Sequence, residues 1–384
     1  MEQQAVVHHW SSLSKLGFIA TSSFSMLLIL PIILGGMAET LGYSNQLIGW
    51  IATSNALGIA IGSLWLPLQK RRPDNFRVLG VSLSVVLVAD ICAAFIVEPI
   101  ALIPIRFLAG LFGGITYTII LSVLAGLPKP QRGFSLYVLV YCGWSSMGFF
   151  SAPYLQEWGG LRLLYGFLVL TSLLSLLFLP VLRQFQQSKH PQMPFQTRDI
   201  FRTPRIWLSL LSYFAVQAAF GGVWTYLERI GVMQGHSPQL IGQSLSLGEL
   251  TGIPISLLVY TLSSRYGIKW PIAGGILAAI GSVICVQYAT DSSLLYFIGV
   301  FFLSAAWSFL IPLYQMVQAA LDTQGKIISF GAFINLSGRS AGPAMVAILI
   351  SSFSLGSALW FGIISFLIAF ALIYPSIPDP SKTS

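Results

Sequence analysis

Long apolar stretches of helical length, separated by short polar segments, run through the whole sequence. An α-helix needs about 20 mostly apolar residues to cross the hydrocarbon core of a membrane. The pattern therefore predicts twelve transmembrane helices, the first of them retained as an anchor because no cleavage site follows it. The helices are expected at residues 16–36, 46–68, 76–97, 100–126, 133–155, 162–182, 206–229, 238–262, 270–289, 294–320, 327–352 and 355–375.

The composition fits a membrane protein better than any soluble class. Hydrophobic residues make up 55% of the 384 positions and charged residues 8%, whereas about 25% of the residues in a soluble domain are charged. The three cysteines, Cys92, Cys142 and Cys285, are odd in number and lie inside apolar stretches. They therefore indicate neither a disulfide framework nor a thiolate metal site, and the expected class is an all-α membrane protein.

The basic residues set the expected orientation. Of the twenty lysines and arginines, sixteen fall in the tails and loops on one side of the predicted membrane, while Arg162 and Arg229 fall on the other. Because basic loops remain in the cytoplasm, both termini are expected there, in a bacterial inner membrane. Although the net charge is +8, the basic residues do not gather on a soluble segment of domain size, which argues against nucleic-acid binding.

An internal repeat divides the chain into two related halves. Gly42-Tyr-Ser-Asn-Gln-Leu-Ile-Gly49 and Gly235-His-Ser-Pro-Gln-Leu-Ile-Gly242 match at six of eight positions, 193 residues apart. A second echo, 190 residues apart, pairs Gly148–Pro153 with Gly338–Pro343. A duplicated unit of this kind places the substrate site between the halves, near the middle of the membrane. The expected domains are a six-helix half over 1–182, a cytoplasmic linker over 183–205 and a second six-helix half over 206–384.

Twelve helices, cytoplasmic termini, a basic central linker and a six-plus-six repeat resemble the major facilitator superfamily over essentially the whole chain. Arg106-Phe-Leu-Ala-Gly110 is similar to the family's R-x-x-q-G motif, and Gly148–Pro153 resembles part of the glycine-proline motif of its proton-driven antiporters. Gly62 and the basic residues 70–72 are similar to its loop motif after the second helix, although Leu66 replaces the usual acidic residue. The resemblance implies the major facilitator fold and a bacterial exporter of the drug or metabolite type.

Four ionisable residues lie inside predicted helices: Asp90, Arg106, Glu249 and Arg339. A charge at the centre of a bilayer costs about 3 kcal/mol on insertion scales, so each is a functional candidate. In the functional interpretation Glu249 binds a proton or a cationic group, while Arg339, with Asn335 one turn before it, meets an anionic group. The alternative is a structural ion pair between the two helices. The resemblance implies coupling or gating for Arg106, and Asp90 is either a proton site or a bond to a neighbouring helix.

Aromatic and amide side chains recur at helical spacing on three helices that the resemblance places at the central cavity. Such faces suit an amphipathic organic ligand, and the alternative is packing between helices. The substrate-binding candidates of this kind are Tyr141, Trp144, Gln217, Trp224 and Tyr314.

No sequence of the form GxxxxGK is present to bind ATP. The four histidines lie in tails or loops, so the sequence indicates neither a catalytic nor a metal site within the membrane. We expect no enzyme activity and no cofactor, and a proton gradient as the driving force.

The sequence therefore predicts a secondary active transporter that moves a small amphipathic or ionisable organic molecule across the inner membrane by alternating access. Proton-coupled efflux is the favoured direction, with the chain acting as a monomer on its substrate and on protons within the lipid bilayer. The alternative is proton-coupled uptake of a small organic anion or zwitterion. A channel or a non-transporting receptor is the third interpretation.

Overall fold

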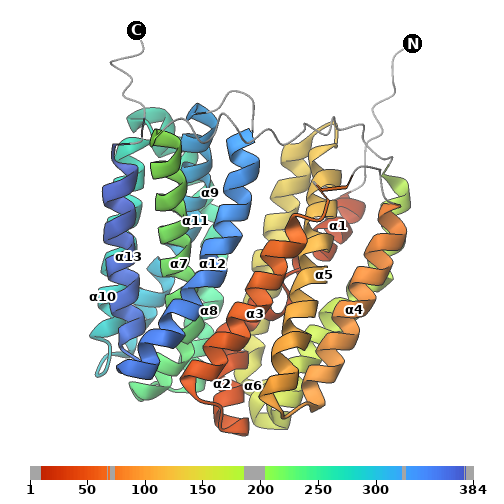
Figure 1. Ribbon diagram of the computed structural model, residues 1–384, viewed down its shortest axis with the longest axis horizontal. Coiled ribbons are helices and arrows are strands. Elements are labelled where there is room, and N and C mark those ends of the chain that lie inside the picture. The colour runs from red at the N-terminus through yellow and green to blue at the C-terminus, as the bar shows by residue number, and fades with distance from the viewer. Residues whose placement is uncertain are drawn as a thin grey trace.

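The computed structural model contains long helices arranged in two bundles that lie side by side (Figure 1). It describes residues 10–66, 68–69, 74–185, 204–321, 326–375 and 377, so most of the predicted linker 183–205 lies outside the described residues. The N-terminal bundle contains α1 (Trp10–Ser22), η1 (Ser25–Ile29), α2 (Leu30–Leu41), α3 (Asn45–Ser63), α4 (Asn75–Phe95), α5 (Pro99–Ala125), α6 (Pro130–Phe178) and η2 (Leu179–Gln184). The C-terminal bundle contains α7 (Pro204–Met233), α8 (Pro238–Leu250), α9 (Gly252–Tyr266), α10 (Lys269–Gln287), α11 (Ser293–Leu321), α12 (Lys326–Ser352) and α13 (Ser357–Ile373).

Each of the twelve segments that the sequence predicts overlaps a described helix or pair of helices. Seven helices are long and apolar enough to cross a bilayer on their own, and two bent pairs raise that number to nine. One of the seven, α6, contains two predicted spans, because its helical dihedrals break at Gly159 and Gly160. The other two predicted spans are α3, which carries polar residues such as Asn45 and Asn55, and the 17-residue α13.

Two predicted spans are bent, which the hydrophobic pattern does not indicate. The axis of α1 and that of the segment after it meet at 85°, across the hydroxyl-rich Ser22–Ser25. Ser22 Oγ donates to the Ile19 carbonyl at 2.8 Å, and Ser145 Oγ from α6 donates to the Leu28 carbonyl at 2.7 Å. These hydroxyls occupy backbone acceptors beside the bend. The segment that contains α8 and α9 bends by 48°.

Both copies of the first repeat adopt the same local structure. Gly42 follows α2 with φ 68°, and Gly235 follows α7 with φ 82°, a left-handed conformation that glycine adopts at little cost. Two residues later the side chains of Ser44 and Ser237 accept from the backbone N–H three residues ahead, at 3.2 and 3.3 Å. Each serine thereby caps the next helix, α3 or α8. The repeated sequence thus encodes a turn followed by a helix start.

The last glycine of each copy meets the second repeat of the opposite bundle. A Cβ at Gly242 of α8 would lie 2.7 Å from Cγ of Pro153 in α6. A Cβ at Gly49 of α3 would lie 3.2 Å from the carbonyl oxygen of Pro343 in α12. Glycine therefore allows the two bundles to approach at backbone distance. We call these two interactions the crossed glycine–proline contacts.

The bundles meet most closely toward one face of the molecule. We call the face at which α1 begins and α13 ends the terminal face, and the opposite one the far face. Figure 1 shows α2, α3, α8 and α12 converging at the far face. There the Tyr226 hydroxyl of α7 donates to the Asn45 carbonyl at the start of α3, at 3.1 Å. The crossed glycine–proline contacts lie toward the same face, so the two bundles are closed against each other on that side.

Candidate functional site

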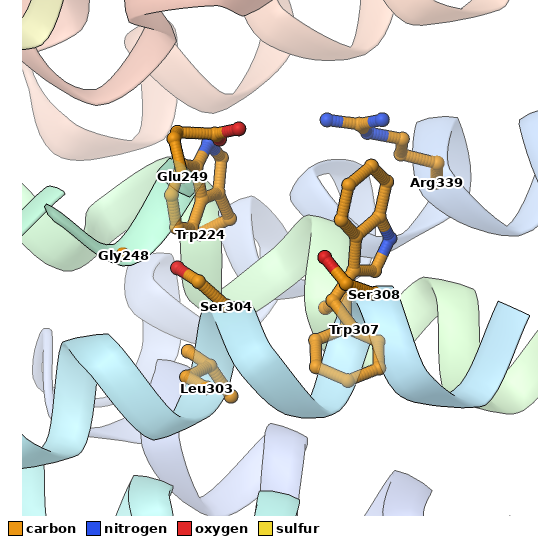
Figure 2. A pocket seen from close by; sticks show the side chains of 9 residues that line it. Trp224, Gly248, Glu249, Leu303, Ser304, Trp307, Ser308 and Arg339 are labelled. Atoms are coloured by element: carbon orange, nitrogen blue, oxygen red, sulfur yellow. The ribbon is translucent and has the colours of Figure 1, made fainter. Parts of the chain in front are cut away.

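A small pocket with a cavity volume of about 30 Å³ lies among four helices of the C-terminal bundle. Its lining combines two indole rings, hydroxyls and one charged group of each sign, shown in Figure 2. The lining residues are Phe220 and Trp224 of α7, Gly248 and Glu249 of α8, Leu303, Ser304, Trp307 and Ser308 of α11, and Arg339 of α12.

Glu249 and Arg339 face each other across this pocket. Figure 2 shows the carboxyl and the guanidinium directed toward one another from opposite sides, with the Trp307 ring below the Arg339 guanidinium. The two groups act on each other electrostatically, but they are not among the ion pairs within 4.0 Å that the described residues form. A carboxylate and a guanidinium held apart in this way leave room for a ligand group to contact either one.

The floor of the pocket offers hydrogen-bond donors that have no partner. The Arg339 guanidinium lies 5.0 Å from the centroid of the Trp307 ring, a cation–π distance. Trp307 Nε1 donates to Gln217 Oε1 at 3.3 Å. Within the described part of the chain, Ser304 Oγ and Trp224 Nε1, which both belong to residues that line the pocket, are buried and unpartnered. Since buried polar groups are normally bonded, these atoms mark places where a ligand or water is expected.

The N-terminal bundle supplies one wall of the same region. The Tyr141 hydroxyl of α6 interacts with the Arg339 side chain, and Cys142 interacts electrostatically with Glu249. A Cβ at Gly252 would lie 3.1 Å from Cys142 Sγ, so the two bundles are in contact here. The charged groups therefore lie at the interface between the bundles, where a change in their relative position would reach them.

Three other predicted site residues are engaged by neighbouring helices. Trp144 Nε1 donates to Thr171 Oγ1 at 2.9 Å inside the N-terminal bundle. Asn335 Nδ2 donates to the Tyr213 hydroxyl at 2.6 Å, and the Tyr213 ring stacks on Tyr314 with centroids 4.9 Å apart. These residues form hydrogen-bonded packing next to the pocket and do not line it.

Arg106 and Asp90 form a second, separate ionic site within the N-terminal bundle. Arg106 Nη1 lies 2.9 Å from Asp90 Oδ1, and both side chains are fully buried. Arg106 Nη2 donates to the Ala89 carbonyl at 2.8 Å, and Ser172 Oγ donates to Asp90 Oδ2 at 3.1 Å. The ring of Tyr165 lies 5.5 Å from the guanidinium. The structure thus pairs these two predicted residues with each other and directs them away from the pocket.

Among the polar residues that line the pocket, Ser304 and Ser308 were not predicted from the sequence. They lie four residues apart on α11 with Trp307 between them, and this spacing places all three on one face of the helix. The same spacing could have identified them. In the described residues, no group of three or more histidine, cysteine, aspartate or glutamate side chains could hold a metal ion.

Comparison with known proteins identifies a related family and fold. The family model described as the Major Facilitator Superfamily matches residues 16–343. A protein of Bacillus subtilis (strain 168), NiaP, named for niacin/nicotinamide transport, is 22% identical over 340 residues, which are 84% of each chain.

Three solved structures share the fold at low sequence identity. The nucleoside transporter NupG is 15% identical with a TM-score of 0.78, covering 95% of this chain and 98% of that one. A D-xylose-proton symporter is 14% identical with a TM-score of 0.77, covering 96% and 97%. The human organic anion transporter TETRAN is 17% identical with a TM-score of 0.64, covering 95% and 98%. These likenesses confirm the predicted fold class.

Proposed function

We propose a substrate for this chain from the premise that it belongs to the Major Facilitator Superfamily and is therefore a membrane transporter and not an enzyme. The proposed substrate is a small aromatic molecule that carries an anionic group, either alone or together with a cationic group. The chain moves it as a secondary active transporter, by alternating access of the pocket to the two sides of the membrane.

The observation that carries the proposal is the open arrangement of Glu249 and Arg339. An arginine at membrane depth cannot lose its charge, and the partly buried Arg339 guanidinium has no carboxylate within 4.0 Å among the described residues. The guanidinium therefore favours a ligand carboxylate, which it can hold through two parallel hydrogen bonds. The indole rings of Trp307 and Trp224 favour an aromatic ring next to that carboxylate, and Ser304 offers a free hydroxyl.

Two of the similar proteins have names that agree with this chemistry. One is named for niacin/nicotinamide transport and one for organic anion transport. Niacin is an aromatic ring with a carboxylate, so nicotinate is a suitable first probe. These names support the proposed substrate because the molecules they mention have the chemistry that the pocket of this chain favours.

Glu249 is the proposed coupling residue, and the charge of the substrate sets the sign of coupling. An anion next to Glu249 adds a second negative charge, so it binds together with a proton on that carboxyl, which gives symport. A zwitterion brings its own cationic group to Glu249 and displaces the proton, which gives antiport. Like charges in one buried site cannot both remain ionised.

The direction of transport follows from this distinction. Export, which the sequence favours, corresponds to the zwitterion and to antiport. Uptake is the second candidate, favoured by the likeness to a D-xylose-proton symporter and by the open guanidinium. We propose that both termini lie in the cytoplasm of a bacterial cell, since the basic loops favour that orientation.

The test is gradient-driven flux in proteoliposomes. Labelled nicotinate serves as the anionic probe and an aromatic amino acid as the zwitterionic one, each under an imposed pH gradient. For Glu249→Gln, which fixes the neutral form, we expect loss of uphill transport with substrate exchange partly retained. Uphill transport by Glu249→Gln at the wild-type rate from about pH 5 to pH 8 would show that Glu249 is not the coupling residue, with Asp90 the next candidate.

A matched control removes a carboxylate that is exposed at the far face. Glu157→Gln changes one glutamate of α6 to glutamine outside the pocket. We expect it to transport like the wild type. If neither probe is carried or exchanged by the wild type, the proposed substrate class is wrong.

A further inference from the structure

A third buried carboxyl lies at the far face, between the two bundles. Glu228, near the end of α7, is 7% exposed, and its Oε2 has no hydrogen-bond partner within the part of the chain that the structure describes. The carboxyl packs against Gly35 of α2, and a Cβ at Gly35 would collide with it. This carboxyl is thus part of the seal that closes the bundles at this face.

The neighbouring Arg229 forms its ion pair with a different carboxyl, while its Nε has no partner among the described residues. Arg229 Nη1 lies 3.5 Å from Oε1 of Glu39 on α2, across the bundle interface. Gln156 of α6 donates to the other oxygen of Glu39 at 2.8 Å. Glu39 and Arg229 are the charged groups that act on Glu228. In the described structure this corner therefore holds two carboxyls and one guanidinium.

Two further titratable side chains approach Glu228 from the remaining sides. Tyr296 of α11 interacts with it electrostatically, and the Tyr296 hydroxyl donates to the Leu227 carbonyl at 2.9 Å. The ring of His236, which precedes α8, lies 4.7 Å from the Tyr296 ring. Neither residue forms an ion pair with Glu228 in the described structure.

We propose that Glu228 is a second proton-binding residue, whose protonation is linked to closure of the far face. One proton on Glu228 balances the excess carboxyl, whereas a buried carboxylate without a partner is strongly disfavoured. Separation of the bundles moves Gly35 away from Glu228, and water then solvates the charged form. Closure of the far face therefore takes up a proton, and opening releases it.

Closure of the far face involves the seal and not the pocket, so it can be measured without substrate. Spin labels on Thr40 of α2 and Met233 of α7, both exposed, report the separation of the bundles at the far face. The three native cysteines are first replaced, and the labelled protein is reconstituted in lipid nanodiscs. Double electron–electron resonance between about pH 5 and pH 8 then measures the ratio of closed to open molecules.

For one linked proton the ratio of closed to open molecules rises by up to about tenfold for each unit by which the pH falls. We expect Glu228→Gln, which mimics the protonated form, to remain closed at every pH. Glu39→Gln removes the excess carboxyl and frees Arg229 to pair with Glu228, so it should weaken the pH dependence. The control His236→Gln, which leaves both carboxyls in place, should keep the pH dependence. A wild type without pH dependence overturns the proposal, as does a Glu228→Gln variant that titrates like the wild type.

Two neighbouring glycines provide a test that does not alter the carboxyl. Gly35→Ala places a methyl group against Glu228, so the closed population should fall at every pH. Gly36→Ala instead meets Leu164, within the same bundle, at 3.1 Å, and should close like the wild type. Normal closure of Gly35→Ala would show that the carboxyl is not part of the seal.

Discussion

The two bundles each bury one arginine and one acidic residue at membrane depth, but they use them differently. In the N-terminal bundle Arg106 Nη1 and Asp90 Oδ1 are 2.9 Å apart, and a backbone carbonyl and a serine add hydrogen bonds, although Arg106 Nε has no partner among the described residues. In the C-terminal bundle Arg339 and Glu249 face each other across a pocket without forming a close pair. The first pair is closed and the second is open.

This difference distinguishes charged residues that stabilise a membrane protein from charged residues that bind a ligand. A closed pair offsets part of its desolvation cost by direct contact between its two charges, which leaves less capacity for a ligand. An open pair has unmet capacity on both sides, and its neighbours Ser304 and Trp224 also lack partners in the described structure. We therefore propose that an arginine and an acidic residue in contact stabilise the N-terminal bundle. In the C-terminal bundle the same two kinds of charge lie apart and bind the ligand.

The largest expected effect comes from breaking the closed pair. Asp90→Ala leaves Arg106 buried without a counter-charge, so the free energy of unfolding should fall by about 3–5 kcal/mol. Glu249→Ala in the open pair should change it by about 1 kcal/mol or less. Denaturant unfolding of the purified protein in detergent measures both. Equal losses for the two variants would contradict the distinction between a closed and an open pair.

Removal of the Arg339 guanidinium from the open pair should weaken the binding of nicotinate. Arg339→Lys keeps the charge but loses the planar fork, and Arg339→Gln loses both. We expect nicotinate affinity to fall about tenfold for lysine and up to about a hundredfold for glutamine, measured by calorimetry. Arg162→Lys, at an exposed position, should bind like the wild type. Unchanged affinity in Arg339→Gln would mean that the arginine does not meet the ligand.

The smallest expected effect comes from a change of Trp307 in the floor of the pocket. Trp307→Phe keeps an aromatic ring below the Arg339 guanidinium but weakens the interaction between the ring and that group by about 0.5–1 kcal/mol. The affinity for nicotinate should then fall about two- to fivefold, with transport retained. Trp158→Phe, at a position that is 76% exposed, is the control. A loss above tenfold would assign Trp307 a direct polar contact with the ligand.

The helices were predictable because each apolar stretch has the length that a bilayer requires. The 85° bend after α1 was not predictable from the sequence. Ser22, Ser23 and Ser25 are too few to interrupt the apolar pattern, and the bond from Ser145 of α6 to the Leu28 carbonyl beside the bend is a tertiary contact. Local composition does not contain that information.

The site was predictable only where charge made residues stand out. Glu249 and Arg339 were identified because ionisable groups are rare in the membrane, and both line the pocket. Trp144 and Tyr314 were selected by spacing, but the same spacing is found on a helix face that packs against a neighbouring helix. Ser304 was missed because serine is common in membrane helices.

The crossed glycine–proline contacts also bear on ancestry. Each contact joins the first repeat of one bundle to the second repeat of the other, so residue i meets j and j meets i, as in an isologous homodimer. A single six-helix ancestor with one such glycine and one such proline could have formed both contacts by pairing with its own copy. Fusion of two copies then freed each to diverge. The closed charge pair of one bundle and the open pair of the other are differences that a homodimer of identical chains could not have acquired.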